Sequence, residues 1–275
     1  MATTATGATR DETAETTGAM DEIKVYWQPG CSSCLRTKEF LTEHGVPFKS
    51  IDVLADPQGF RDLQALGVRM IPLVVKGRDW VSGQILSDVA RIAGIEYGRK
   101  LLPVEDLKAR IDTILAAALR YSAQLPDDEA VLATLLPNRP RSYRDLACHI
   151  FLIVEAFVAE TEGDPLTEAK YLAPAPDHVR RPAEIVAFGE GVRDRFEAWW
   201  GQAGHDFGRP ANVYYGKQTL HDYLERTAWH SGQHTRQLAL VLEKLGIAPE
   251  GKLAAADYAG LPMPANVWDD EKRWD

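Results

Sequence analysis

Residues 25–41 read VYWQPGCSSCLRTKEFL, and this stretch decides the fold of the N-terminal part of the chain. Its apolar beginning predicts a β-strand, and the residues that follow the Cys-X-X-Cys motif predict a helix. Cys31 therefore lies at a helix N-terminus, where free backbone N–H groups and the helix dipole stabilise a thiolate. We interpret Cys31 as the nucleophile and Cys34, one turn further along the helix, as the thiol that resolves a mixed disulfide.

Two other interpretations of this cysteine pair are half of a zinc site and two buried structural cysteines. A structural zinc site usually has four protein ligands, and the third cysteine, Cys148, lies far along the chain in a different sequence pattern. A redox function is favoured because the pair stands between a strand and a helix, the context in which this motif is redox-active.

Short apolar segments alternate with helical patterns up to residue 98. Strands are expected at 23–27, 46–53, 71–75 and 79–83, and helices at 34–45, 59–67 and 87–95. The alternation predicts an α/β sandwich whose strands are too few and too short for a Rossmann domain. We assign residues 21–98 to this domain, and we interpret residues 1–20, which lack an apolar run, as a disordered tail.

This region resembles the glutaredoxins, which have the thioredoxin fold, over about residues 22–97. The resemblance rests on the segments QPGCSSC, GVRMIPLVV and WVSGQ, although two serines separate the cysteines where the family usually has Pro-Tyr. It implies that Pro72 is cis beside the active cysteine and that the backbone of Ile71 binds a thiol peptide such as glutathione. Gly83, in the turn after the fourth strand, is included in the same binding region. The alternative for Pro72 is a trans proline that opens an edge strand.

Beyond residue 98 the strand pattern largely disappears, and four amphipathic helices are expected. Their ranges are 102–125, 142–160, 182–200 and 219–246. Ser142 and Asp145 are placed as a capping box at the start of the second helix. Four helices of this length predict an all-α bundle, which we assign to residues 99–250. The predicted fold class is thus α/β plus all-α, with residues 251–275 as a solvent-facing C-terminal tail.

Three histidines of the helical part form a candidate metal site. His230 and His234 are four residues apart, so they project from one face of the fourth helix. His149 lies on the apolar stripe of the second helix, and the three imidazoles are expected to converge inside the bundle. They could hold one divalent metal and leave positions open for water or a thiolate. The sequence does not distinguish zinc, nickel, iron and manganese. The alternative is three hydrogen-bonded core histidines. Cys148 is expected to be a buried hydrophobe, and His221 is expected to face outward.

With one histidine on the second helix and His-X-X-X-His on the fourth, this half resembles the DinB-like family over about residues 103–246. The resemblance implies an up-down four-helix bundle with a divalent metal. It also implies, in several branches of the family, an enzyme that activates a low-molecular-weight thiol for transfer or isomerisation.

Composition limits the partners and the location of the protein. The chain of 275 residues has 31 basic and 40 acidic residues and a net charge of −9, which argues against nucleic acid or an anionic membrane as a partner. No apolar stretch approaches the roughly twenty residues that span a bilayer. Three cysteines do not suggest a secreted disulfide framework, so a cytoplasmic protein is expected. A homodimer is compatible with Trp199 and Trp200 at a helix end.

A small thiol shared by the two halves is the leading functional hypothesis. The metal would lower the pKa of the bound thiol, and the thiolate would attack an electrophilic small molecule. The Cys31–Cys34 domain would then reduce a mixed disulfide or a thiol conjugate. Two alternatives are a metal- or partner-binding redox sensor or reductase whose bundle is not catalytic, and a protein-disulfide reductase with a vestigial metal site.

Overall fold

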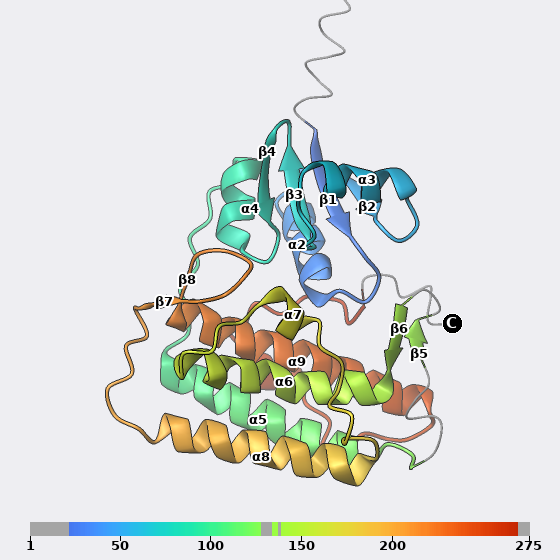
Figure 1. Ribbon diagram of the computed structural model, residues 1–275, viewed down its shortest axis with the longest axis vertical. Coiled ribbons are helices and arrows are strands. Elements are labelled where there is room, and N and C mark those ends of the chain that lie inside the picture. Colours follow the sequence, from blue (N-terminus) through green and yellow to red (C-terminus); the bar gives the residue numbers. More distant parts are fainter. Residues whose placement is uncertain (1–21, 128–133, 137–138, 269–275) are drawn as a thin grey trace, which may run out of the picture.

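The chain folds into an N-terminal α/β unit that sits on a layer of long helices (Figure 1). A computed structural model describes residues 22–127, 134–136 and 139–268. The disordered tail expected at residues 1–20 lies outside the described residues. Among the described residues, we find no helix whose apolar stretch is long enough to cross a membrane.

The N-terminal unit is a four-stranded sheet with the strand order β2-β1-β3-β4. Its strands are β1 (Ile23–Trp27), β2 (Phe48–Asp52), β3 (Leu73–Lys76) and β4 (Asp79–Ser82), and its helices are α2 (Ser32–Glu43), α3 (Pro57–Ala65) and α4 (Leu86–Ala93). Strand β1 pairs with β2 in parallel and with β3 antiparallel, and β4 pairs antiparallel with β3. Every strand and helix expected in this unit is present, with ends that differ by a few residues.

Successive residues of β1 face opposite sides of this sheet, so the unit has two small cores. Val25 lies with Val74 in the core that α2 and α4 cover, whereas Tyr26 lies with Leu73 in the core on the α3 side. Both faces of the sheet are therefore buried, and the end of β1 is held firmly where the chain turns toward Cys31.

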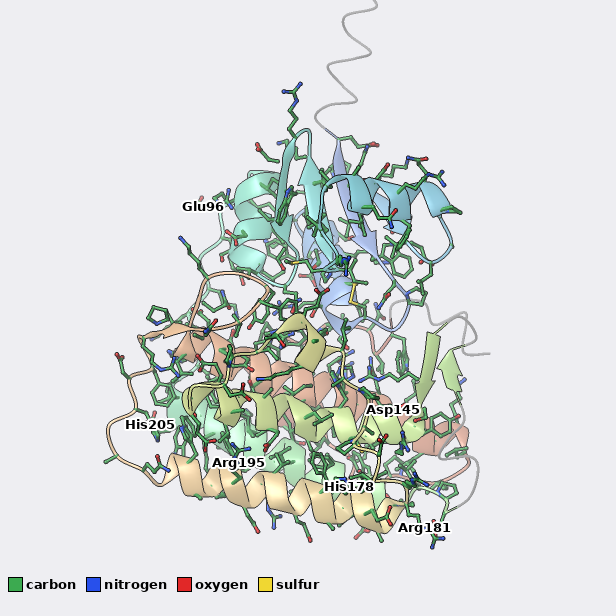
Figure 2. All side chains as sticks on the ribbon, in the orientation of Figure 1. Glu96, Asp145, His178, Arg181, Arg195 and His205 are labelled. Carbon is green, nitrogen blue, oxygen red and sulfur yellow. A yellow bond between two sulfur atoms is a disulfide. The ribbon has the colours of Figure 1, made fainter. Side chains whose placement is uncertain are left out.

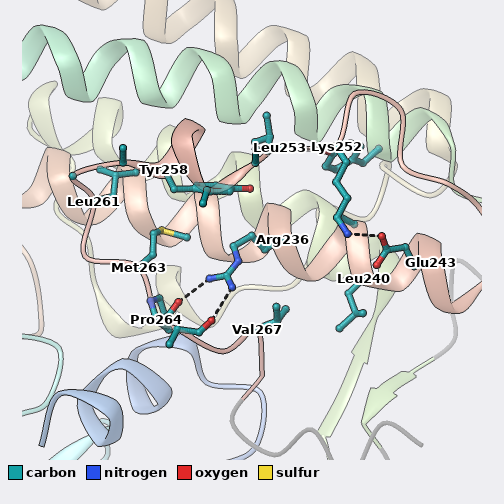
Figure 3. Close-up of a pocket in the computed structure, with 17 residues that line it drawn as sticks. Arg236, Leu240, Glu243, Lys252, Leu253, Tyr258, Leu261, Met263, Pro264 and Val267 are labelled. Atoms are coloured by element: carbon teal, nitrogen blue, oxygen red, sulfur yellow. Dashed lines mark hydrogen bonds and ion pairs between the residues drawn. The ribbon is translucent and has the colours of Figure 1, made fainter. Parts of the chain in front are cut away.

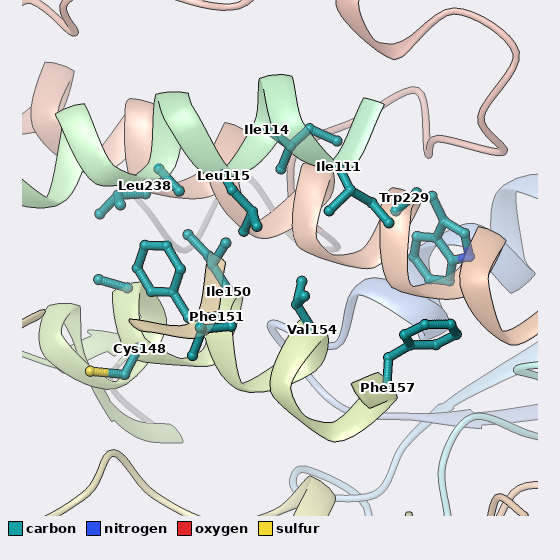
Figure 4. Close-up of a cluster of buried hydrophobic side chains, with 14 of the residues drawn as sticks. Ile111, Ile114, Leu115, Cys148, Ile150, Phe151, Val154, Phe157, Trp229 and Leu238 are labelled. Atoms are coloured by element: carbon teal, nitrogen blue, oxygen red, sulfur yellow. The ribbon is translucent and has the colours of Figure 1, made fainter. Parts of the chain in front are cut away.

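The C-terminal part is mostly helical. Its elements are α5 (Val104–Ala123), β5 (Thr134–Leu136), β6 (Arg139–Ser142), α6 (Tyr143–Thr161), α7 (Glu168–Tyr171), α8 (Pro182–Trp200), β7 (Pro210–Ala211), β8 (Gln218–Thr219), α9 (Leu220–Lys244) and a 3₁₀ helix (Ala255–Tyr258). The sequence pattern predicted the four long helices and the Ser142–Asp145 capping box but missed the short strands and α7. Apolar side chains of α5, α6 and α9 meet in the core between these helices (Figure 4).

The order in which the long helices pack differs from the alternating up-down order that we expected. Helices α5 and α6 each pack mainly on α8 and α9, and α9 packs on α5 and α6 rather than on α8. In Figure 1, α5 and α9 run in one direction and α6 and α8 in the other. Long connections before α8 and α9 allow the chain to cross the ends of the helices. Arg195 of α8 forms ion pairs with Glu155 of α6 and with Glu162, the C-cap residue of α6, at the surface of this packing (Figure 2).

Glu160 fastens the connection that precedes α9 to the end of α6. Glu160 is 4% exposed. Its carboxylate accepts hydrogen bonds from Arg209 Nη1 at 3.0 Å, Arg209 Nη2 at 2.7 Å and the Asn212 N–H at 2.7 Å. Burial raises the pKa of Glu160, but the hydrogen bonds from Arg209 and Asn212 outweigh it and lower the pKa overall. The ionised form is therefore the one that stabilises the fold.

Glu160→Gln is expected to lower the free energy of unfolding by about 2 kcal/mol at neutral pH, because Arg209 loses its charged partner inside the protein. Since the folded-state pKa is depressed, this contribution is present above the unfolded pKa and is lost as the pH falls through the folded value. Urea denaturation at several pH values measures it. Glu190→Gln, on the exposed face of α8, is the control. A difference that stays constant down to acidic pH would contradict the ion-pair explanation.

Residues 251–268 are not the solvent-facing tail that we expected. Tyr258, Leu261 and Trp268 are all less than one-tenth exposed, and they pack into the helical core. The sequence did not predict that this segment packs on the helices, because its apolar residues, interrupted by glycines and prolines, follow neither a helical nor a strand period. Residues 269–275 lie outside the described residues.

The C-terminal segment also contacts both parts of the chain. Arg236 of α9 donates to the carbonyl oxygens of Pro264 and Ala265 (Figure 3). The carboxylate of Glu39, in α2, accepts hydrogen bonds from the backbone N–H groups of Ala265 and Asn266. The segment therefore links the N-terminal unit to α9.

The N-terminal unit and the helices share a packed interface. Ile85 belongs to the hydrophobic core of the helical part, and the Gln84 side-chain amide donates to the hydroxyl of Tyr214 at 3.0 Å. The guanidinium of Arg36 lies 4.0 Å from the centre of the Trp229 ring. These contacts fix how α2, with its cysteines, sits over α9.

Candidate redox and metal site

The cysteine pair lies at the end of the N-terminal unit that faces the helices, where its sulfur–sulfur bond is yellow in Figure 2. Cys31 and Cys34 form a disulfide. Cys31 is the N-cap residue of α2, and its Sγ accepts a hydrogen bond from the N–H of Cys34 at 3.2 Å. The same N–H would stabilise a Cys31 thiolate in the reduced protein. Cys31 is 9% exposed and Cys34 is fully buried, so an incoming sulfur reaches Cys31 first.

The three residues that the glutaredoxin resemblance placed in a thiol-binding region have different surroundings in the structure. The Ile71–Pro72 peptide bond is cis, and Ile71 packs against Trp27 and the two cysteines. Gly83 lies next to Pro72 and is held by hydrogen bonds within the N-terminal unit. Its N–H donates to the Pro72 carbonyl at 2.8 Å, and its carbonyl accepts from the Thr37 hydroxyl at 2.6 Å.

Packing explains why a glycine stands at position 83. A Cβ atom there would lie 2.8 Å from the ring of Pro72 and 3.0 Å from Thr37 Oγ1. Gly83 therefore lets the chain pass close behind Pro72.

The three histidines come together as the sequence predicted. One ring nitrogen of each of His149, His230 and His234 lies within 4.8 Å of the others. The Nε2 atoms of His230 and His234 are 3.1 Å apart. Two imidazoles bound to one zinc at about 2.0–2.1 Å would have their nitrogens roughly 3.3 Å apart in a tetrahedral site, so the observed spacing fits a shared metal.

His230 is buried on α9 and faces His234 through its Nε2 atom. It is 1% exposed, and its Nδ1 atom has no hydrogen-bond partner. Burial, followed by the charge of Arg226 one turn earlier on α9, holds the pKa of His230 well below its usual value. The neutral imidazole, the form that binds a metal, is thus favoured.

Gln237 orients His234 and was missed in the sequence. Its Oε1 atom lies 2.6 Å from His234 Nδ1, and its amide nitrogen donates to the Val267 carbonyl and, at 3.4 Å, to the hydroxyl of Ser32. With Nδ1 as the donor to Gln237, the lone pair of His234 Nε2 points toward His230. The available signal was a glutamine three residues after a histidine on the same helix, but only the packing of α2 on α9 brings in Ser32.

Cys31 and the three histidines open onto one cavity of about 270 Å³. Its walls are Gln28, Gly30, Cys31, Ser32, Arg141, Asp145, His149, Tyr171, Leu172, Ala173, Pro174, His230 and His234. Tyr171 of α7 stacks on His230, with ring centroids 6.0 Å apart, and meets the ring of His149 edge-on. Sequence reasoning found the cysteines and the histidines separately but missed Tyr171 and Arg141, because these come from segments without a regular pattern.

Cys148 and His221 stay outside this site. Cys148 is fully buried, and burial raises the pKa of its thiol to about 12, so it remains protonated, as expected of a small buried hydrophobe. His221 does not simply face solvent. It is half-buried, and its Nε2 atom lies 2.7 Å from the Leu102 carbonyl.

A larger cavity of about 560 Å³ lies between α9 and the C-terminal segment (Figure 3). Its walls include Tyr121, Leu240 and Met263, and none of its lining residues is a cysteine or a histidine. The groups that could carry thiol chemistry are therefore concentrated in the smaller cavity.

Comparison with known proteins identifies the first of the two parts. Residues 23–81 match the glutaredoxin family. This segment is a glutaredoxin domain. We use that name for the whole N-terminal unit, which continues through α4.

The glutaredoxin domain has relatives that are named as a reductase and as glutaredoxin-like proteins. The chain is 41% identical over 58 residues to the N-acetyl-S-hydroxy-L-cysteine reductase of Bacillus subtilis, a match that covers 20% of this chain and 61% of that protein. It is 28% identical over 71 residues to the glutaredoxin-like protein NrdH of Lactococcus lactis, which covers 26% of this chain and 99% of that protein. A crystal structure of a thioredoxin-like protein is 32% identical and matches 28% of this chain and all of that one, with a TM-score of 0.27. The glutaredoxin domain is therefore of the thiol-oxidoreductase type.

Proposed function

We propose that this protein is a two-centre thiol enzyme. In it, a metal held by the helical part activates a low-molecular-weight thiol, and the glutaredoxin domain reduces disulfides of that thiol. The shared cavity carries the proposal, because Cys31 and the three histidines line the same space of about 270 Å³. A cavity of this size suits a small molecule rather than a protein segment. The helical part would then be a DinB-like bundle.

His149, His230 and His234 would hold the divalent metal through one nitrogen each. When bound, the metal would supply Lewis acidity that lowers the pKa of a coordinated thiol. Gln237 would keep His234 in the tautomer whose Nε2 is free to bind. Tyr171 covers the histidine cluster from α7 and would limit the access of water.

In the transferase step, the thiolate of RSH attacks the carbon of an electrophile R′X. The new C–S bond forms as X⁻ leaves, and the thiol proton passes to solvent, so the products are RSR′, H⁺ and X⁻. Three protein ligands leave coordination positions for the thiol, which suits catalysis better than a purely structural site.

In the reduction step, the Cys31 thiolate attacks one sulfur of a disulfide RSSR. One RS⁻ leaves and is protonated, and a Cys31–SR mixed disulfide remains. Cys34 then attacks the Cys31 sulfur, releases the second RSH and closes the Cys31–Cys34 disulfide seen in the structure. Two electrons pass to the substrate, and an external dithiol or thiol reductase returns the pair to the reduced state.

A small cysteine derivative is the substrate class that we favour for the cysteine pair. The B. subtilis relative is named as a reductase of an S-oxidised cysteine derivative. Glutathione and related thiols belong to the same chemical class. The contacts would come from the cavity wall and from the backbone of Ile71, with Gly83 packed behind Pro72.

The decisive experiment measures both reactions in the full-length protein loaded with a divalent metal. We expect thioether formation from glutathione or cysteine and a halo-nitroarene, followed by absorbance, and reduction of a small disulfide, followed with a coupled reductase. His149→Ala should remove thioether formation, and Cys31→Ser should remove disulfide reduction. If the metal-loaded protein forms no thioether with any small thiol, the helical part is not a transferase and the redox-sensor interpretation replaces this one.

A further inference from the structure

A second cavity, of about 280 Å³, lies between the glutaredoxin domain and α9. Arg36 of α2 and Arg226 of α9 both line it, together with Gln84, Ser87 and Trp229. The cysteines and the histidine cluster are absent from its lining residues. It is therefore a separate space from the proposed thiol site, although Arg226 is only one helical turn from His230.

Both arginines are buried but use little of their hydrogen-bonding capacity. Arg36 is 8% exposed and Arg226 is 4% exposed. Arg36 Nη2 donates to the Gln84 backbone carbonyl, and Arg226 Nη2 donates to the Gln84 side-chain oxygen, each at 2.7 Å. The Nε atom of each guanidinium has no hydrogen-bond partner. A guanidinium has five N–H donors, and each of these two makes one hydrogen bond to a protein acceptor.

The acidic residues around this cavity already have other partners. Glu225 binds Arg99 through both carboxylate oxygens. Asp222 caps α9 by accepting hydrogen bonds from the Thr219 N–H and hydroxyl. Within the described residues, neither Arg36 nor Arg226 forms an ion pair with a carboxylate.

Two buried cations that share one glutamine destabilise each other. Burial, followed by the charge of Arg226, lowers the pKa of Arg36 to about 9, although the group stays protonated at neutral pH. The rings of Trp229 and Tyr215 lie 4.0 Å and 4.6 Å from the two guanidinium carbons and hold these side chains in place. Aromatic contacts offset only part of the cost of burying two like charges, and a negatively charged group between them would offset much more.

The N-terminus of α4 adds a further source of positive potential. Ile85, Leu86 and Ser87 line this cavity at the start of the helix. The N-cap residue is Ile85, whose side chain cannot accept a hydrogen bond from the first turn. The N–H groups and the helix dipole favour an anion at this end. The first turn also contains Asp88, whose carboxylate pairs with Arg91.

We propose that the cavity between α2, the start of α4 and α9 binds the oxyanion of a small molecule, a carboxylate or a phosphate, through Arg36 and Arg226. The planar guanidinium groups suit the bidentate geometry of either anion. Gln84 holds the two arginines near each other, Arg36 through its backbone carbonyl and Arg226 through its side-chain oxygen. This site does not depend on the proposed metal or on the redox state of the cysteines.

The test is a thermal-shift and calorimetric titration of the full-length protein with inorganic phosphate and with malonate, against sodium chloride at equal ionic strength. The two anions distinguish a phosphate-bearing from a carboxylate-bearing ligand. Near a hundredfold excess over Kd, the anion that binds should raise the melting temperature by about 5 °C. Arg36→Gln and Arg226→Gln should each lower the apparent affinity for the anion at least tenfold. Arg61→Gln, on an exposed face of α3, should leave this affinity unchanged.

The same titration in His230→Ala separates this site from the proposed metal centre. A shift that persists there belongs to the arginine cavity, whatever the outcome for the metal. If neither anion raises the melting temperature of the wild-type protein above the chloride control, or if the shift disappears only in His230→Ala, the proposal is wrong. The wild-type measurement alone can contradict the proposal, so the test remains valid even if the arginine variants fold poorly.

Discussion

His230→Ala is expected to lower the affinity of the protein for a divalent metal by more than about a hundredfold, because it removes one of the three ligands of the proposed site. Equilibrium dialysis with zinc, nickel and manganese, followed by metal analysis, measures the change. Since a metal that binds only the folded state stabilises it, chelation should also lower the melting temperature of the wild-type protein but not that of the variant.

Two matched variants make this expectation specific. Gln237→Leu keeps all three ligands but removes the acceptor of His234 Nδ1, and it should weaken metal binding by about tenfold. His178→Ala changes an exposed histidine outside the cluster and should have no effect. If the wild-type protein binds none of the three metals, the cluster is a set of core histidines.

Cys31→Ser is expected to abolish disulfide reduction, since Cys31 is the sulfur that lines the cavity and accepts the Cys34 N–H. Cys34→Ser should instead accumulate a mixed disulfide with the substrate thiol, because the first attack proceeds and the resolving thiol is missing. Mass spectrometry of the intact protein after exposure to oxidised glutathione detects the adduct.

The control for this experiment is Cys148→Ala, which removes a buried thiol whose raised pKa keeps it protonated. It should reduce disulfides at the wild-type rate. Equal trapping by Cys31→Ser and Cys34→Ser would reverse the roles of the two cysteines, and trapping by neither would mean that the disulfide is structural.

Local spacing was enough to predict much of this protein. The Cys-X-X-Cys motif between a strand and a helix predicted the position of Cys31 at the N-cap of α2. The i, i+4 spacing of His230 and His234 predicted that both lie on one face of α9, because one helical turn separates them. Residue spacing along the chain also predicted the Ser142–Asp145 capping box and the four long helices.

Expectations that depended on packing between distant segments were less successful. The order of the long helices was wrong, since long connections allow several arrangements of the same amphipathic faces. The sequence did not show that position 83 must be a glycine because Pro72 approaches it closely. The C-terminal segment was taken for an exposed tail, although Trp268 is buried against the helices.

The sequence by itself determined two sets of reactive side chains, a thiol pair and a histidine cluster, because each set is fixed by periodicity within or between regular elements. Only the tertiary structure decided that Cys31 and the histidines share one cavity, that Gln237 lies between His234 and Ser32, and that two arginines are buried together at the interface. These relations depend on how α2 docks on α9. That docking depends on the combined packing of many side chains that are far apart in the chain, so local sequence patterns do not predict it.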